Sequence, residues 1–507
     1  MDEPTTKPIK ILFLSSDTGG GHRASAEALG TQFLRLFPGS SYALIDCVKD
    51  HGFYGIEDWY QHLSSHPSQW NFVYKFSNIA PVHGIVKAHL KLTTERSVRH
   101  KISEHMPDVV VSVHPLMTNV PASSCKRISS ETGKHLPIFT VVTDLGSGHK
   151  FWFGKHVEKI FIASEKIREL ARKGHIPDEK IVMSGLPIRY DFALEAEALG
   201  PEGRSSLHGK IHQLHIRKKL GIILDDHEDE YRKVLLVMGG GEGVGSLSNI
   251  VNSLYIDLRR SGIQSTILVV CGRNVKLKES LETRQWKQVY SDHISTNKPG
   301  KARKGLVRSA SDLVLNNLPN LIPFKVIGKF NDTQDSAVPN KSTSDISSCQ
   351  KETPSNVIVT PLGFITNMAE YMVAADVLIT KAGPGTIAEA ASVGLPVLAT
   401  SYLPGQEEGN IDFVIEKKFG AYRPDSKPFD ISKCICEWLQ DPDLMAEMSK
   451  HAQEAGRPHA AEDIARAIGT SVLRWKELHP EQEDDTDEHK DNVDEFQRED
   501  SRSSYEA

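Results

Sequence analysis

The chain has 507 residues, more than one hydrophobic core usually organises, so two or three domains are expected. Its 39% hydrophobic and 25% charged residues are typical of a globular protein, and the formal net charge of −6 argues against a nucleic-acid-binding protein. No run approaches the roughly 18 apolar residues that cross a bilayer, so any membrane contact is expected to be peripheral.

The chain begins with a mostly polar stretch, residues 1–8, before the first apolar run. We therefore expect no secretory signal or transit peptide, which leaves a cytosol-facing location or a chain that starts after such a segment. The six cysteines are scattered and match neither a zinc pattern nor a disulfide pattern, so reduced thiols are expected.

The first part of the chain carries five apolar runs with the length of buried strands. These runs cover residues 9–15, 42–47, 109–113, 138–142 and 159–163, and helical or loop-like sequence separates them. Strands that alternate with helices predict a parallel sheet with right-handed crossovers.

The pattern starts again further along the chain. Its runs cover residues 233–238, 266–271, 356–360, 377–380 and 396–400. Each of the two series opens with a strand, a glycine-rich turn and a helix. The predicted fold class is therefore α/β, with two doubly wound, Rossmann-like domains that face each other across a cleft.

The predicted first domain covers residues 1–200, a linker covers 201–230, and the second domain covers 231–478. Residues 282–355 interrupt the second domain with a polar and partly basic insert, which we expect to be mostly an extended loop. Residues 479–507 are almost all polar and acidic, and this composition predicts a disordered tail.

Residues 17–23, Asp-Thr-Gly-Gly-Gly-His-Arg, lie between the first strand and the first helix. Glycines at such a turn let a ligand approach the backbone, and His22 would lie at the carboxyl edge of the sheet, where open α/β folds bind ligands. A histidine there can accept a proton near neutral pH. The alternative is a tight turn in which His22 only begins the helix.

Residues 381–390 follow a predicted strand, and Pro384 and Gly385 suit the first turn of a helix whose amino end faces an anion. Glu389 lies one turn into that helix, where it either reaches a pair of ribose hydroxyls or simply faces solvent. Residues 404–410, Pro-Gly-Gln-Glu-Glu-Gly-Asn, collect amide and carboxylate groups of the kind that bind sugars, or form a solvated loop.

Residues 59–91 mix aromatic side chains, among them Trp70 and Phe72, with histidines and lysines. A segment at a membrane surface has this composition, and so has an aromatic-rich piece of ordinary core.

Together these segments resemble the monogalactosyldiacylglycerol synthase family, whose members have the two-Rossmann-domain fold called GT-B. The matching stretches occur in the family's order and span residues 9 to 422. They are SDTGGGHRASAEAL at 16–29, VSVHPLM at 111–117, TVVTDL at 140–145, GLPIR at 185–189, MGGGEG at 238–243, VVCGRN at 269–274, GFITNM at 363–368, ITKAGPGTIAEA at 379–390, and GLP followed by GQEEGN at 394–410.

The resemblance implies an inverting glycosyltransferase that moves galactose from UDP-galactose to 1,2-diacylglycerol. Such a displacement needs a base for the acceptor hydroxyl, exclusion of water and stabilisation of the departing UDP. By resemblance His22 is the base, and Asp17 or Asp144 orients or replaces it. The acceptor side would be lined by Gly20, Gly21, His114 and Pro115.

The resemblance assigns the donor to the second domain. The residues implied to hold the UDP-sugar are Gly240, Gly241, Glu242, Arg273, Asn274, Phe364, Ile365, Lys381, Gly383, Pro384, Gly385, Thr386, Glu389, Gln406, Glu407 and Asn410. Phe364 and Ile365 would flank the uracil, and Glu389 would bind the ribose. No metal or other cofactor is expected, because helix amides and side-chain donors hold the diphosphate in such enzymes.

The resemblance also implies a peripheral protein of the plastid envelope that contacts anionic membrane lipids. Without a transit peptide, the outer or cytosol-facing side is expected. Two alternatives remain: a transferase that uses UDP-glucose on the same acceptor, and a catalytically silent lipid- or nucleotide-binding protein. The presence of His22, Glu389 and residues 405–410 speaks against the silent protein.

Overall fold

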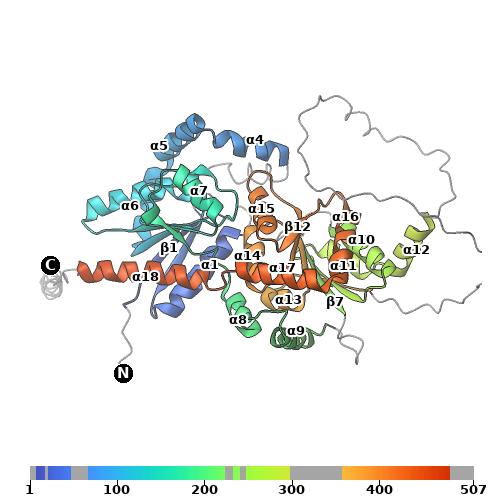
Figure 1. Ribbon diagram of the computed structural model, residues 1–507. Coiled ribbons are helices and arrows are strands. Elements are labelled where there is room, and N and C mark those ends of the chain that lie inside the picture. The colour runs from blue at the N-terminus through green and yellow to red at the C-terminus, as the bar shows by residue number, and fades with distance from the viewer. Residues whose placement is uncertain are drawn as a thin grey trace, which may run out of the picture. The chain divides into compact units, whose positions relative to one another are not determined.

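The computed structural model describes residues 7–16, 21–46, 67–222, 232–239, 247–296 and 357–479. The chain divides into one unit of residues 1–284 with 357–507, and a second unit of residues 285–356. The first unit contains two parallel sheets of six strands each, shown in Figure 1. The predicted α/β class with two doubly wound halves is confirmed.

The first sheet has the strand order β2-β1-β3-β4-β5-β6. Its strands are β1 (Lys10–Ser15), β2 (Ser41–Asp46), β3 (Val109–Ser112), β4 (Ile138–Val141), β5 (Ile160–Ile162) and β6 (Ile181–Met183). The central strands are buried on both faces, as β3 and β4 are along their whole length, which explains their continuous apolar sequence. The short edge strand β6 was not predicted from the sequence.

Helices connect these strands. They are α1 (Gly21–Leu36), α4 (Pro67–Ser77), α5 (Ala80–His105), α6 (Asn119–Thr132), α7 (Glu165–Lys173), α8 (Tyr190–Leu199) and α9 (Leu207–Lys219), with short 3-10 turns at Pro115–Met117, Lys150–Trp152 and Asp178–Lys180. Helix α7 shows how local sequence sets a boundary. The Ser164 hydroxyl caps its first turn by accepting from the amide of Ile167, and Arg172 and Lys173 lie at its negative carboxyl end.

The second sheet has the order β12-β11-β10-β7-β8-β9. Its strands are β7 (Lys233–Met238), β8 (Ser265–Val270), β9 (Val357–Leu362), β10 (Val377–Lys381), β11 (Val397–Ser401) and β12 (Gly420–Tyr422). Its helices are α10 (Leu247–Arg260), α11 (Val275–Glu282), α13 (Met368–Ala374), α14 (Pro384–Ser392), α15 (Glu408–Glu416), α16 (Pro428–Gln440) and α17 (Pro442–Ala455). The edge strand β12 was also missed by the sequence analysis.

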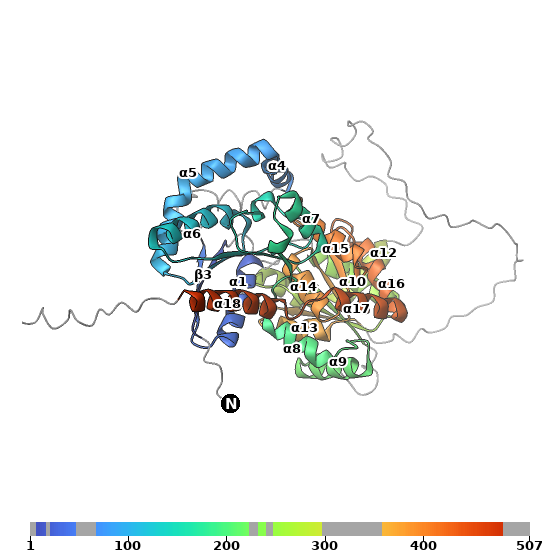
Figure 2. The ribbon, with the colours of Figure 1, turned by 60° about the vertical axis from the view of Figure 1, so that its left-hand side comes forward.

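The last helix, α18 (Ala460–Leu478), packs on the first half although its sequence follows the second. Ile464 and Ile468 are buried in one core cluster with Phe33 and with Phe13 of β1. Figures 1 and 2 both show α18 beside α1. The sequence analysis placed residues 460–478 in the second domain and did not foresee this return.

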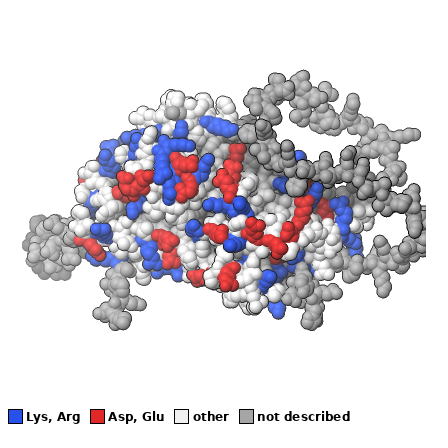
Figure 3. All heavy atoms as spheres, viewed as in Figure 1, with Lys and Arg blue, Asp and Glu red and all other residues white. Residues whose placement is uncertain are grey.

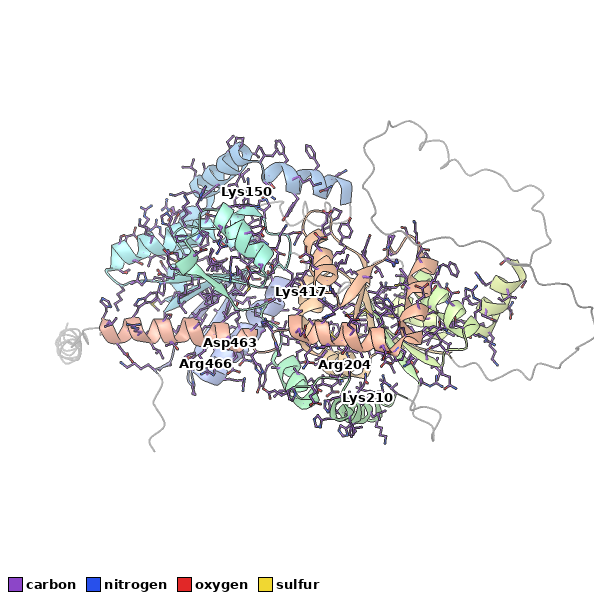
Figure 4. All side chains as sticks on the ribbon, viewed as in Figure 1. Lys150, Arg204, Lys210, Lys417, Asp463 and Arg466 are labelled. Atoms are coloured by element: carbon purple, nitrogen blue, oxygen red, sulfur yellow. The ribbon has the colours of Figure 1, made fainter. Side chains whose placement is uncertain are left out.

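Helix α9 lies within the predicted linker and packs against the second half. Arg204 and Arg217 donate to backbone carbonyls at the end of α13: Arg204 to Val373 at 2.7 Å and Arg217 to Ala374 at 2.8 Å. Figure 4 labels Arg204 at this junction. The linker therefore contributes a buried, hydrogen-bonded element and does more than join the halves.

In the second unit the structure describes helix α12 (Trp286–Thr296). These residues are helical, which the sequence analysis did not predict, and the rest of the insert, residues 297–355, lies outside the described residues. The predicted tail, apart from residue 479, lies outside them as well.

The two halves meet at a contact between two backbones. A Cβ added to Gly146 would overlap the carbonyl group of Gly409, and a Cβ added to Gly409 would overlap Gly146. Two hydrogen bonds flank the contact: the Leu145 amide donates to Asn410 Oδ1 at 3.2 Å, and the Gly409 amide donates to Ser147 Oγ at 2.8 Å. Glycine on both sides is therefore required for this approach.

We expect Gly146→Ala to lower the free energy of unfolding by about 2 kcal/mol or more, because overpacking against backbone has no side chain that can move away. Gly84→Ala is the matched control, since a Cβ at this position in α5 would meet nothing within 4 Å. The control should gain about 0.5–1 kcal/mol from the better helix propensity of alanine. Denaturant unfolding measures both, and equal stabilities of the two variants would contradict the tight contact.

Candidate active site

His22 is the second residue of α1 and lies at the carboxyl edge of the first sheet. It is buried, and its Nδ1 lies 2.7 Å from Oγ1 of Thr143, which follows β4. The ring of His114, which follows β3, stands edge-on to it with 4.7 Å between the centroids. His22 thus does more than begin a helix, because neighbouring strands place partners around its ring.

Burial lowers the pKa of His22 from its ordinary value of 6.5 to about 4, and a hydrogen bond to the backbone of Val113 opposes this effect. Burial and the neighbouring His22 also hold the pKa of His114 well below its usual range. Both imidazoles are therefore neutral at neutral pH. A neutral imidazole is the form that can accept a proton.

Asp144 lies next to Thr143 and is also buried. Its Oδ2 accepts a hydrogen bond of 2.8 Å from the indole of Trp152, whose ring centroid lies 6.1 Å from that of His22. Burial raises the pKa of Asp144 to about 7, the Trp152 hydrogen bond opposes the rise, and the charge of Glu407 adds to it. The structure therefore places Trp152 beside both His22 and Asp144, and His114 beside His22.

The other first-half residues of the predicted site are only partly described. Gly21 begins α1, and Pro115 begins the short turn that His114 precedes. Asp17 and Gly20 lie outside the described residues.

In the second half, Lys381 at the end of β10 forms an ion pair of 2.8 Å with Glu407. The second carboxylate oxygen of Glu407 accepts from the amide of Leu403 at 2.8 Å. Asn410 is fully buried, and its amide nitrogen donates to the Ala382 carbonyl at 2.9 Å. Gln406 is half-buried, and residues 408–410 form the start of α15, so the segment 404–410 is an ordered turn that leads into a helix and is not a solvated loop.

Helix α14 begins with Gly383 at the N-cap and Pro384 in the first turn, and no side chain caps it. The amides of Gly385 and Thr386 lie in that same first turn, where helices attract anions. A Cβ added to Gly385 would meet nothing within 4 Å, so the space beside this turn is open.

Glu389 is part-buried within α14 and does not simply face solvent. It forms an ion pair of 2.9 Å with Arg189, which ends the segment 185–189 of the first half. Burial raises the pKa of Glu389, and the charge of Arg189 opposes the rise. This pair is a second link between the halves, and a ribose bound at Glu389 would share the carboxylate with Arg189.

The predicted nucleotide residues at β8 and β9 lie at a different part of the same sheet. Arg273 lies over the ring of Phe364 at 5.8 Å, and Phe364 is 66% exposed. The Asn274 side chain accepts from the Leu277 amide and so caps α11, and Ile365 packs against the core. Gly240, Gly241 and Glu242 lie outside the described residues.

Within the part of the chain that the structure describes, no three His, Cys, Asp or Glu side chains gather as a metal site would require. No helix within those same ranges is both long enough and apolar enough to cross a membrane.

Three residues of the site were missed by the sequence analysis: Thr143, Trp152 and Arg189. Thr143 and Arg189 stood inside the quoted stretches TVVTDL and GLPIR, so a signal existed for them. Trp152 had no local signal, because its contact with Asp144 depends on the turn between them.

Helices α4 and α5 expose apolar side chains beside a cluster of lysines. Phe72, Phe76, Ile85 and Leu92 are 68%, 49%, 70% and 87% exposed. We call Lys87, Lys91, Lys126, Lys155 and Lys180 the lysine cluster. Burial and then the charges of Lys155 and Lys91 lower the pKa of Lys87. The described aromatic side chains Phe72 and Phe76 are therefore surface residues and not core.

The pKa values predict opposite contributions to stability from His22 and Asp144. Between about pH 4 and 6.5 the unfolded state binds more protons at residue 22 than the folded state, so this residue makes stability rise with pH. The pKa of Asp144 is about 7 in the folded protein, compared with an ordinary value of 3.8. Between these two pH values the folded state binds more protons at residue 144 than the unfolded state, so this residue makes stability fall as pH rises.

We therefore expect His22→Asn to make the slope of unfolding free energy against pH less positive between pH 4 and 6.5, by up to about 1.4 kcal/mol per pH unit. Asp144→Asn should shift the same slope in the positive direction. Unfolding measured at several pH values tests both, and slopes that match the wild type would contradict the buried, shifted groups.

Comparisons with known proteins point to one family. Residues 22–188 match the family model described as monogalactosyldiacylglycerol (MGDG) synthase, and residues 328–464 match the glycosyltransferase family 28 C-terminal domain. The chain is 30% identical over 484 residues to monogalactosyldiacylglycerol synthase 1, chloroplastic, of Arabidopsis thaliana, which covers 93% of this chain and 73% of that protein.

A second relative supports the same family, and a solved structure supports the same fold. Monogalactosyldiacylglycerol synthase, chloroplastic, of Spinacia oleracea is 30% identical over 477 residues, covering 92% of this chain and 73% of that protein. The crystal structure of Acinetobacter baumannii MurG has a TM-score of 0.51 at 14% identity, covering 91% of this chain and 100% of that one, which supports the fold alone. The chain belongs to the monogalactosyldiacylglycerol synthase family of glycosyltransferases with the GT-B fold.

Proposed function

We propose that this chain transfers galactose from UDP-galactose to the free hydroxyl of 1,2-diacylglycerol, with inversion at the anomeric carbon. The observation that carries the proposal is the meeting of two groups of residues. The buried cluster of His22 and Asp144 lies beside the backbone contact of Gly146 with Gly409, which belongs to the loop expected to bind the hexose. An acceptor held by the first half would thus lie next to a sugar held by the second.

In this mechanism the acceptor oxygen attacks the anomeric carbon while the bond to UDP breaks and its electron pair passes to the diphosphate. Neutral His22 takes the hydroxyl proton. Its low pKa makes it a weak base in the free protein, and the negative diphosphate of a bound donor would raise that pKa toward neutrality. Because the pKa of Asp144 lies near 7, its carboxyl group can gain or lose a proton while His22 acts on the acceptor hydroxyl.

The second half would stabilise the leaving group without a metal. The free amides at the start of α14 face the open space beside Gly385, and the charge of Lys381 lies near at the end of β10. Glu407 holds the lysine in place, while the Arg273 and Phe364 pair supplies a cation and an aromatic face for the nucleotide.

We infer that the protein is peripheral and that α4, α5 and the lysine cluster contact anionic lipids. Exposed apolar side chains beside basic ones are the features that bind such a surface. In Figure 3 the part of the surface around α5, α6 and α7 carries basic side chains with acidic ones between them. The relatives named above are chloroplastic, so a plastid envelope is the proposed location.

The reaction is tested with purified protein, UDP-galactose and vesicles that contain diacylglycerol, with mass analysis of the lipid product. We expect galactolipid, and His22→Ala should abolish it while the affinity for UDP stays within about twofold, because the base does not touch the nucleotide. UDP-glucose in place of UDP-galactose tests the nearest alternative. Glucolipid without galactolipid would overturn the choice of donor, and normal turnover by His22→Ala would overturn the base.

Membrane contact is tested by charge reversal. The double variant Lys87→Glu, Lys155→Glu should bind vesicles with anionic lipid at least about tenfold more weakly, since each basic residue near such a surface contributes about 1 kcal/mol. Lys210→Glu is the control, because Lys210 lies on α9, far in Figure 4 from Lys150 of the membrane-side half. Equal vesicle binding by the double variant and the control in co-sedimentation would rule out this surface.

A further inference from the structure

Tyr74 of α4 reaches across to the second half. A Cβ added to Gly405, whose φ is +79°, would lie 2.8 Å from Cδ1 of the Tyr74 ring. Gly405 immediately precedes Gln406 and Glu407, which belong to residues 404–410, the segment proposed to bind the hexose. The ring of Tyr74 therefore lies against the backbone of that loop, where only a glycine leaves room for it.

The same ring also lies against the loop that follows Asp144 in the first half. It stands edge-on to His149, with 5.2 Å between the centroids. Burial and the negative charge of Asp144 raise the pKa of Tyr74, so its hydroxyl stays protonated and lies within electrostatic reach of that carboxyl group. Tyr74 thus contacts the acceptor-side and the donor-side loops at once.

One side of helix α4 is held by hydrogen bonds to residues 149 and 150, and its opposite side is exposed to solvent. Ser77 Oγ lies 2.9 Å from His149 Nε2, and Asn78 accepts from the Lys150 amide at 3.0 Å. On its outer side, Phe72 and Phe76 stack with 5.7 Å between ring centroids and are exposed. The helix therefore stands between the surface proposed to meet the membrane and the reacting groups.

We propose that Tyr74 is a specificity-determining residue that closes the acceptor end of the site against water, so that the lipid alcohol and not water receives the hexose. This inference rests on the proposed function. An activated sugar nucleotide is open to attack by bulk water wherever its site is not sealed. The ring of Tyr74 packs against the backbone of Gly405 on one side and against His149, in the loop after Asp144, on the other, where a seal between the two halves is needed.

The side reaction is balanced as follows. The oxygen of a water molecule attacks the anomeric carbon, the bond from that carbon to the UDP oxygen breaks, and its electron pair passes to the diphosphate. The proton lost by the water goes to His22. The products are free galactose and UDP, which are distinguished from galactolipid and UDP by assaying free sugar.

The test measures free galactose and galactolipid in the same reaction, with diacylglycerol vesicles and UDP-galactose. Tyr74→Ala should raise the ratio of free galactose to galactolipid about tenfold. Tyr74→Phe keeps the ring and should leave the ratio near that of the wild type. Lys210→Glu, on α9 and outside both the proposed membrane surface and the site, is the control and should leave the ratio unchanged.

An unchanged ratio in Tyr74→Ala, with both products reduced together, would overturn the proposal, because a merely structural role lowers both reactions alike. If Tyr74→Ala does not fold by circular dichroism, Tyr74→Leu keeps apolar volume without the flat ring and is held to the same criterion. Galactolipid formation by the wild type tests the proposed function separately. A wild-type protein that makes no lipid product would refute that function. The ratio of free galactose to galactolipid in Tyr74→Ala tests only the role of Tyr74.

Discussion

The site depends on one backbone contact, the approach of Gly146 to Gly409. Two parallel sheets each collect ligand-binding loops at their carboxyl edges, but a transfer reaction needs the two edges close enough to share substrates. The contact without side chains brings the loop that follows Asp144 against residues 404–410, and the hydrogen bonds of Asn410 and Ser147 fix its register. Larger residues at either position would separate the acceptor side from the donor side.

That closeness also explains the protonation states in the cluster. Packing of Trp152 and His114 around His22 removes water, which favours the neutral imidazole, and burial raises the pKa of Asp144 to about 7. The charge of Glu407 acts on Asp144 from the other half. A donor that binds between the halves would therefore change the proton affinity of His22 and Asp144, the groups proposed to activate the acceptor.

Local sequence predicted the central architecture because buried parallel strands are continuous apolar runs and glycines mark the turns that follow them. The runs at β1, β3, β7 and β10 were found to within one or two residues. The edge strands β6 and β12 were missed, since three residues each with partly exposed side chains leave no such run. The return of α18 to the first half was missed because its apolar stripe shows that one face is buried and not which sheet buries it.

The sequence by itself determined the α/β class, the family and the segments that contain His22, Glu389 and residues 404–410. Only the tertiary structure decided that Leu145 would meet Asn410, 265 residues away, that Arg189 would pair with Glu389, and that Tyr74 would lie on Gly405. The physical reason is that periodicity and turn chemistry act over a few neighbouring residues. How two finished sheets face each other depends on surfaces assembled from distant segments.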